Sequence, residues 1–302
     1  MNRYHAYGLE VSSDRAIAAL VRKDAAPLAD VAVIDAKIDT EGLSFAPLED
    51  ADASDAWVAY SWDTNRTVIR FPGVTAEFDL HHRQIKVDDS SADEGYAEHV
   101  VLDHVLPRWL SLSGDLVLHG SAVATARHAG IAFIGDTGRG KSTTATALAM
   151  RRCWTLLADD VCRIIDPQST PLIVPSYPGV RLTSQSRTEL TPDYASTPLA
   201  AGSDKGRVCP DVAPVYGPVP LRLVVALGEN SASLDARRLG LGEATATLVR
   251  NIFHQARTLG DIAPQAFLLA SEVAAGIPCY QVDFPRQWGV FDDLSELLES
   301  LV

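Results

Sequence analysis

The stretch FIGDTGRGKST, at residues 133–143, decides how the rest of this chain is interpreted. Residues 135–142 fit the pattern G-x-x-x-x-G-K-[ST], in which a glycine-rich loop wraps closely around phosphate groups. An apolar segment precedes the loop and an alanine-rich segment follows it, so a strand, the loop and a helix are expected in that order. The stretch therefore predicts an α/β fold in which this loop binds a nucleotide.

The loop also predicts which of its groups bind phosphate. Backbone N–H groups and the N-terminus of the following helix are expected to face the phosphates. Lys141 is expected to reach the β- and γ-phosphates, and Ser142 to ligate Mg²⁺, so ATP and Mg²⁺ are the expected cofactors. Arg139 is expected to point outwards. The predicted cofactor-binding residues are Gly135, Asp136, Thr137, Gly138, Arg139, Gly140, Lys141, Ser142 and Thr143.

An acidic pair ends the strand expected after the loop helix. Asp159 and Asp160 follow the apolar run WTLLA, and Asp160 comes 19 residues after Lys141. In a parallel sheet this position places both carboxylates at the carboxyl edge, where ligands of open α/β sheets bind. Adjacent aspartates usually decorate a surface turn, but beside this loop metal binding and general-base work are favoured. One carboxylate can hold Mg²⁺ while the other takes the proton from an attacking hydroxyl.

His119 is the third candidate. It lies in the apolar run LVLHGSAV, 16 residues before Gly135. A lone histidine on an apolar strand is more often a structural residue than a functional one. A hairpin between this strand and the loop would return His119 to the same side of the sheet, so the residues alone leave both interpretations open.

Composition and charge exclude several classes of protein. The chain has 302 residues, of which 47% are hydrophobic and 22% charged, which is typical of globular proteins. Its formal net charge is −13, and residues 1–113 carry −10 of it, so a nucleic-acid partner is not expected. No segment has the apolar length of a membrane helix, and the N-terminus lacks the apolar core of a signal peptide. A cytoplasmic protein without a membrane partner is expected.

The four cysteines are scattered along the chain, with no CxxC pair and no histidine at zinc spacing. A structural zinc site is therefore not expected. We expect the cysteines to be small core side chains in a reducing compartment. They are Cys153, Cys162, Cys209 and Cys279.

The pattern of apolar residues predicts a smaller β-rich N-terminal domain over residues 1–92, a connecting helix over 93–113 and a nucleotide-binding domain over 114–302. Pro107 is expected to kink or break the connecting helix. The last domain alternates strand-like and helix-like segments up to its C-terminus. The strands expected in the first domain are YGLEVSS, VAVIDAKI, WVAYSW, TVIRF, VTAEFDL and RQIKVD.

Residues 191–220 are rich in Pro, Gly and Ser and are predicted to form a long loop, a feature that often acts as a lid. Arg181 before this segment, and Lys205 and Arg207 within it, are further candidates for contact with phosphate or substrate. A transferring phosphoryl group needs more positive charge than one lysine supplies. Isolated basic residues in loops are nevertheless usually solvated, so their role stays open.

Three motifs in this order, HGSAV, GDTGRGKST and LLADDV, resemble the catalytic domain of HPr kinase/phosphorylase. YGLEVSSD, IRFPGVTAEF, LPRWLSLSGDLVLHGSAV and YPGVRL resemble its relatives encoded beside peptide-modification systems such as lasso-peptide clusters. The resemblance implies a P-loop kinase domain of the HPr kinase and phosphoenolpyruvate carboxykinase type, in which ATP phosphorylates a serine-type hydroxyl. It implies that Asp159 is the base, that Asp160 assists with metal binding or hydrogen bonding, and that His119 supports the acidic pair.

The chain departs from HPr kinases in two places. Cys153 and Trp154 stand where HPr kinases usually have a Gly-His step. The C-terminal segment with glycine and arginine, which serves phosphate return and subunit contact in those enzymes, has no counterpart. The resemblance therefore does not extend to phosphorylase activity, to HPr as the substrate or to a hexamer.

The sequence thus predicts an ATP-dependent kinase acting on serine of a peptide or protein, with three alternatives. A small-molecule alcohol as acceptor predicts a closed pocket under residues 190–217, whereas a peptide predicts an extended groove or an exposed sheet edge in the N-terminal domain. A regulatory nucleotide-binding module without turnover is the second alternative, although sensing ATP requires no base. An ATPase that uses water as acceptor is the third.

Overall fold

The chain forms two compact units in the computed structural model. The first comprises Met1–Gly114 and His254–Ala263, and the second comprises Asp115–Phe253 and Pro264–Val302. None of the helices in the described part of the chain has the length and apolar character that a membrane span requires. The structure describes residues 1–20, 29–47, 57–61, 66–90, 94–199, 204–210, 217–253 and 262–302.

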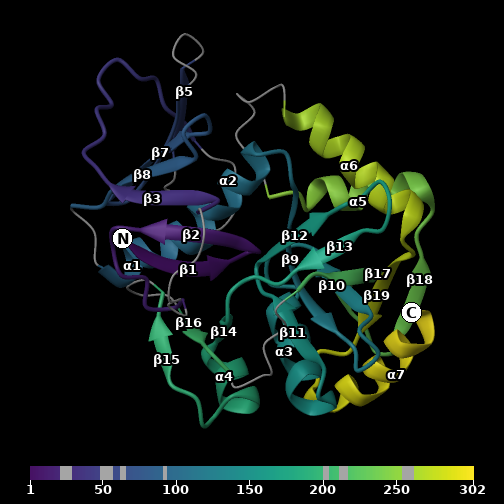
Figure 1. Cartoon of the computed structure of the whole chain (residues 1–302). Coiled ribbons are helices and arrows are strands. Elements are labelled where there is room, and N and C mark those ends of the chain that lie inside the picture. The colour runs from purple at the N-terminus through teal and green to yellow at the C-terminus, as the bar shows by residue number, and fades with distance from the viewer. Residues whose placement is uncertain are drawn as a thin grey trace. The chain divides into compact units, whose positions relative to one another are not determined.

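The first unit contains a mixed sheet of eight strands, in the order β1-β2-β3-β8-β7-β6-β5-β4 (Figure 1). Strand β3 is parallel to β2 and β8, and the other neighbours are antiparallel. All six strands expected from the sequence are present, whereas β1 and β4 were not expected. The strands are β1 (Asn2–Ala6), β2 (Leu9–Ser13), β3 (Val31–Asp35), β4 (Ala46–Pro47), β5 (Trp57–Ser61), β6 (Arg66–Phe71), β7 (Val74–Asp79) and β8 (Gln84–Asp88).

The helix expected over residues 93–113 lies within this first unit and changes its winding along its length. It begins as α1 (Glu94–Val100), continues as the π-helical η1 (Val101–Val105) and ends as α2 (Leu106–Leu112). Pro107, which lacks an N–H and crowds the carbonyl four residues before it, lies two residues after the π-helical part ends at Val105. The distortion predicted at Pro107 therefore takes the form of a locally widened helix.

The second unit contains a sheet in the order β10-β9-β12-β13-β17-β19-β18, with β11 also paired to β9 and β10 to β17. The sheet is mixed, because β9 runs antiparallel to β10, β11 and β12, whereas β17 is parallel to β10 and β19. The short turn between β9 and β10 forms the hairpin considered from the sequence, and such a turn can join only antiparallel neighbours. The strands are β9 (Leu116–Ala124), β10 (Gly130–Ile134), β11 (Thr155–Ala158), β12 (Val161–Ile165), β13 (Leu172–Val174), β17 (Val219–Asn230), β18 (Asp235–Arg238) and β19 (Cys279–Phe284).

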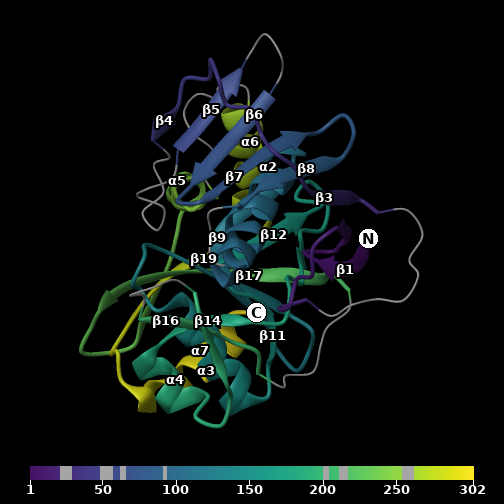
Figure 2. The ribbon, with the colours of Figure 1, turned by 90° about the vertical axis from the view of Figure 1, so that its left-hand side faces the viewer.

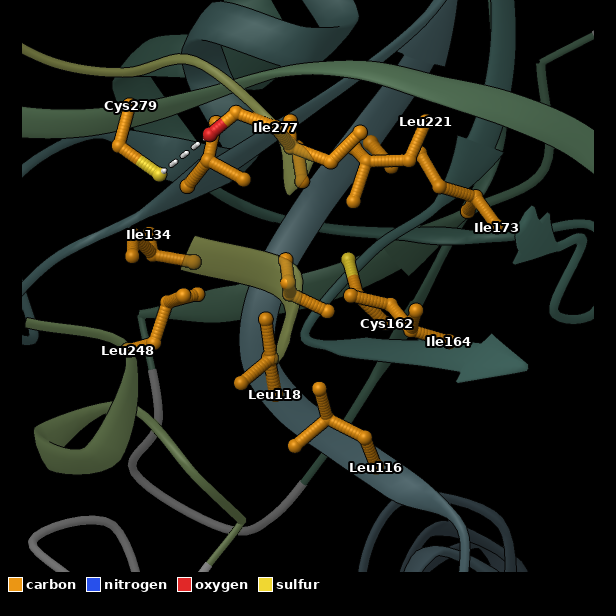
Figure 3. Close-up of a cluster of buried hydrophobic side chains, with 14 of the residues drawn as sticks. Leu116, Leu118, Ile134, Cys162, Ile164, Ile173, Leu221, Leu248, Ile277 and Cys279 are labelled. Carbon is orange, nitrogen blue, oxygen red and sulfur yellow. Dashed lines mark hydrogen bonds between the residues drawn. The ribbon is translucent and has the colours of Figure 1, made fainter. Parts of the chain in front are cut away.

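Helices cover both faces of this sheet (Figures 1 and 2). On one face lie α5 (Leu241–Arg250) and α6 (Ile262–Gly276), and on the other α3 (Lys141–Arg152) and α7 (Phe291–Leu301). Each face has its own apolar core. Figure 3 shows the core on the α5 side, where Leu118 of β9 lies among Ile134, Leu248 and Cys162. Because side chains alternate along a strand, the odd-numbered residues of β9 face α3 instead.

A small three-stranded sheet in the order β14-β16-β15 completes the second unit. The long loop predicted over residues 191–220 is therefore partly wrong, because two strands of this sheet and the start of β17 lie within it. Strands of three and four residues are too short for their alternation to be visible among Pro and Gly. Residues 200–203 and 211–216 of the predicted loop lie outside the described residues. The elements are β14 (Val180–Thr183), α4 (Ser184–Leu190), β15 (Ser196–Pro198) and β16 (Lys205–Val208).

Two of the four cysteines are buried and two are exposed. Cys162 and Cys279 are buried, and burial raises the pKa of both thiols, that of Cys279 to about 11. Cys153 and Cys209 are exposed, so the expectation that all four lie in the core is wrong for these two. Cys153 is exposed because it takes the left-handed position (φ 54°) that ends α3.

Candidate functional site

The glycine-rich loop, residues 135–142, connects β10 to α3, so the predicted strand and helix are both present. Gly138 and Gly140 have φ values of 84° and 86°, and a Cβ at either would meet no heavy atom within 4 Å. Glycine is therefore required at these two positions by the backbone conformation and not by lack of space. Gly135 is required by space as well, since a Cβ there would lie 2.9 Å from the carbonyl oxygen of Leu227 in β17.

Lys141 is the first residue of α3, and its side chain folds over the loop. Its buried Nζ donates to the carbonyl oxygens of Gly135 at 2.7 Å and Asp136 at 3.2 Å. The ammonium therefore adds positive charge to the loop and to the helix N-terminus, where backbone N–H groups already favour anions.

The remaining loop side chains are directed differently. The guanidinium of Arg139 binds both carboxylate oxygens of Glu229, at 2.5 and 2.6 Å, and this hydrogen bonding lowers the pKa of Glu229. Thr143 Oγ1 lies 2.9 Å from Ser186 Oγ and so connects the first turn of α3 to α4. Ser142 is half-buried, and the exposed residues are Asp136, Thr137 and Gly138.

The acidic pair lies at a break between two strands. Strands β11 and β12 pair in succession with the same side of β9, with Ala158 opposite Ala122 and Val161 opposite His119. Asp159 and Asp160 occupy the interruption, and Asp160 adopts a φ of 65° there. A left-handed residue is uncommon away from glycine, and such positions often occur at functional sites.

The loop and the acidic pair lie at the same edge of the sheet. Both β10 and β11 run antiparallel to β9, so their C-terminal ends point the same way. Ile134, the last residue of β10, pairs with Gly120, and the N–H of Gly120 donates to the carbonyl of Asp160 at 3.1 Å. The loop and the acidic pair therefore leave from opposite sides of Gly120, about 10 Å apart at the usual strand spacing.

Each oxygen of the Asp159 carboxylate has its own donor. The hydroxyl of Ser121 donates to Oδ1 at 2.7 Å, and the backbone N–H of Arg181 donates to Oδ2 at 2.7 Å. The residue is only 4% exposed. Two donors from different elements hold the plane of this buried carboxylate, while each oxygen keeps a second lone pair for a further proton donor.

Asp160 is held by charged side chains instead. The guanidinium of Arg181 forms an ion pair with Oδ1 of Asp160, and Nε2 of His119 lies 3.7 Å from the same oxygen. The side chains of Arg181 and Asp160 are 7% and 9% exposed. A buried carboxylate requires such a partner, because its desolvation is otherwise uncompensated. Arg181 thus contacts both aspartates, one through its main chain and one through its side chain.

The other basic candidates lie beside this pair. Arg207 of β16 is the register partner of Arg181 on β14, and its guanidinium lies 5.4 Å from the centre of the Tyr177 ring. Arg181 and Arg207 are buried and Lys205 is half-buried, so the two arginines are not solvated as isolated loop residues usually are. As register partners they share one face of the small sheet, and Arg181 carries that positive charge to Asp160.

Two residues that the sequence did not single out have central positions. Ser121 binds Asp159, as described above. Asn251, at the end of α5, accepts a hydrogen bond from the N–H of Gly135 at 2.9 Å and donates one to the carbonyl of Thr247 at 2.8 Å. Its own carbonyl accepts the N–H of His119 at 2.7 Å. Asn251 therefore connects the start of the loop to β9. The place of Ser121 in the motif HGSAV, as a polar residue next to apolar ones, is the signal that could have indicated it.

The donor groups fit a nucleotide with Mg²⁺ better than they fit a metal held by protein alone. Within the described ranges, no group of three or more His, Cys, Asp or Glu side chains could hold a metal ion. Mg²⁺ is commonly bound by one or two carboxylates together with substrate phosphates. The Asp160 carboxylate and the Ser142 hydroxyl are oxygen donors of that kind, and the loop N–H groups with Lys141 suit the phosphates.

No protein-family model matches the chain, and no curated protein matches it in sequence. Among solved structures, the HPr(Ser) kinase/phosphatase from Coxiella burnetii is similar over 61% of this chain and 92% of that chain, at 14% identity and a TM-score of 0.30. A similarity at this level supports no conclusion about fold or activity.

Proposed function

We propose that this chain is a kinase that transfers the γ-phosphate of ATP to a hydroxyl group, with serine of a peptide or protein as the acceptor. The observation that carries the proposal is the placement of two buried, separately held carboxylates at the sheet edge from which the glycine-rich loop leaves. A protein that only senses ATP requires the loop, but it has no use for a carboxylate fixed as a base.

The residues would share the work as follows. The N–H groups of the loop, together with Lys141, bind and orient the phosphates of ATP. Asp159 accepts the proton of the acceptor hydroxyl, because its two donors leave a lone pair on each oxygen. Mg²⁺, bound by Asp160 and Ser142, would neutralise charge on the phosphates. His119 faces the same oxygen of Asp160 as Arg181 and so supports the orientation of that carboxylate.

The class of acceptor rests on the motifs. YGLEVSSD, IRFPGVTAEF, LPRWLSLSGDLVLHGSAV and YPGVRL resemble the HPr-kinase-related proteins of peptide-modification clusters, which favours serine of a peptide over a small alcohol. Nothing in the described geometry of the second unit requires the acceptor to be small.

The test is phosphate transfer in an extract of the source organism, followed by mass spectrometry. The extract is incubated with Mg-ATP and the wild type, Asp159→Asn or Lys141→Ala. We expect a gain of one phosphate on an acceptor with the wild type only. Asp159→Asn should retain nucleotide binding, whereas Lys141→Ala should weaken it. Asp235→Asn, which makes the same change at an exposed residue of β18, is the matched control.

The outcomes separate the alternatives. A phosphorylated metabolite in place of a peptide would correct the acceptor class, and rapid ATP hydrolysis without any acceptor would identify an ATPase. Nucleotide binding without turnover in any extract would favour the regulatory module. Normal transfer by Asp159→Asn would remove Asp159 as the base.

A further inference from the structure

The hydroxyl of Ser121 is placed differently from an ordinary buried serine. Ser121 lies in the middle of β9, is completely buried, and shares the α3-facing side of the strand with His119 and Val123. Its register partner on β10 is Phe133. In this apolar region a buried hydroxyl requires a hydrogen-bond partner to offset its desolvation. That partner is a side chain of the candidate site.

The hydrogen bond from Ser121 to Asp159 is a strong one. Ser121 Oγ lies 2.7 Å from Asp159 Oδ1, a length typical of charge-assisted hydrogen bonds. An ionised carboxylate can only accept, so the serine hydroxyl is the donor and its rotation is fixed. Since Asp159 is 4% exposed, water has little access to replace this donor.

The second donor to Asp159 is a backbone N–H, which remains after any side-chain substitution other than one to proline. This N–H of Arg181 holds Oδ2. Ser121 is therefore the side chain through which the position of the carboxylate can be altered without changing Asp159 itself. Misplacement of a catalytic group by about 1 Å can lower a rate by roughly a hundredfold.

We infer that Ser121 is a positioning residue for phosphoryl transfer: its hydroxyl fixes the Asp159 carboxylate in the orientation in which Oδ1 or Oδ2 can take the proton of the acceptor. This inference rests on the proposed function. It assigns Ser121 no contact with ATP, with metal or with the acceptor.

The test compares two replacements that have the same shape as each other. Ser121→Thr retains the hydroxyl and Ser121→Val lacks it, while both add the same bulk, so packing effects cancel between them. We expect kcat of the valine variant to be roughly 10- to 100-fold below that of the threonine variant, as loss of a hydrogen bond to a charged group implies. The Kd for ATP should change by no more than about twofold, because the Ser121 hydroxyl donates to Asp159 and to no group of the loop. Ser121→Ala, which adds no bulk, serves if the larger side chains prevent folding.

Two controls show whether Ser121 acts through Asp159. Measured on the purified acceptor at high enzyme concentration, the small residual rate of Asp159→Asn should fall little further when Ser121 is also replaced by valine, because the two residues act as one unit. Ser295→Ala removes another completely buried serine hydroxyl, which donates to the carbonyl of Asp292 at 2.7 Å in α7, and should leave kcat unchanged. Ser295 has no place in the site.

Each result decides a different question. Equal kcat for Ser121→Thr and Ser121→Val, or additive losses with Asp159→Asn, would overturn the positioning role while leaving the kinase proposal intact. Absence of transfer by the wild type would overturn the kinase proposal, and with it the catalytic meaning of the Ser121 contact. A loss in ATP affinity that matched the loss in kcat would assign Ser121 to the nucleotide site instead.

Discussion

Gly120 separates the two β9 residues that contact the acidic pair, and replacing it by alanine should disturb the whole edge of the sheet. A Cβ at Gly120 would lie 2.6 Å from the carbonyl oxygen of Phe133 and 3.2 Å from Cγ2 of Ile134. Real Cβ atoms essentially never come within 3.0 Å of another heavy atom, so β9 and β10 would have to separate by roughly 0.4 Å or more. A backbone carbonyl in a paired strand cannot rotate away, so no side-chain adjustment relieves the contact.

The expected loss of stability is at the upper end of the range for overpacking, about 3 kcal/mol, or a fall in Tm of roughly 6–12 °C. Thermal unfolding of purified Gly120→Ala measures it. Gly242→Ala is the control, since a Cβ there meets no heavy atom within 4 Å and alanine favours the helix by up to about 1 kcal/mol. Phosphate transfer should fall as well, because His119 and Ser121 move with the strand. Equal melting temperatures for the two variants would refute the reasoning.

Three further predictions concern the second unit. Arg181→Gln should lower the free energy of unfolding by about 3–5 kcal/mol, because it leaves the buried Asp160 carboxylate without its cation, and adding Asp160→Asn should recover part of the loss in urea denaturation. Asn251→Ala should weaken ATP binding roughly tenfold in calorimetry, since the N–H of Gly135 loses its acceptor; an unchanged Kd would show that the loop does not depend on this contact. Burial raises the pKa of Cys279 from 9.0 to about 11, so the folded state keeps a proton that the unfolded chain releases between these values. Stability should therefore fall by about 2 kcal/mol as pH rises through this range, and urea denaturation of Cys279→Ala should lack this part of the decline.

The elements nearest to the loop could be predicted because the spacing of apolar residues typical of a strand or a helix extends over enough residues in each. Strands β9 and β10 and helix α3 lie where the apolar patterns placed them. Strand direction is different, because a period of two is the same in parallel and antiparallel sheets. The short connection indicated a hairpin between β9 and β10, but alternation alone does not give the direction of the other strands of the mixed sheet.

In the candidate site, the sequence predicted the residues that belong to a recognisable motif, such as Lys141 and the two aspartates. It did not predict the groups that hold them. Ser121 and Asp159 are 38 positions apart, and Gly135 and Asn251 are 116 apart, so these contacts depend on strand register and on the end of α5. Neither serine nor asparagine carries a spacing rule that would have indicated such a partner.

The exposed cysteine at the end of α3 offers a route to optical measurement of nucleotide binding. Cys153 follows a helix of 12 residues that begins at Lys141, so a fluorophore attached to its thiol would sit roughly 18 Å from the loop and leave the loop itself unmodified. Only Cys209 would have to be replaced, because Cys162 and Cys279 are buried. A label at this position would respond to changes in the α3 environment when ATP is added, without any acceptor being known.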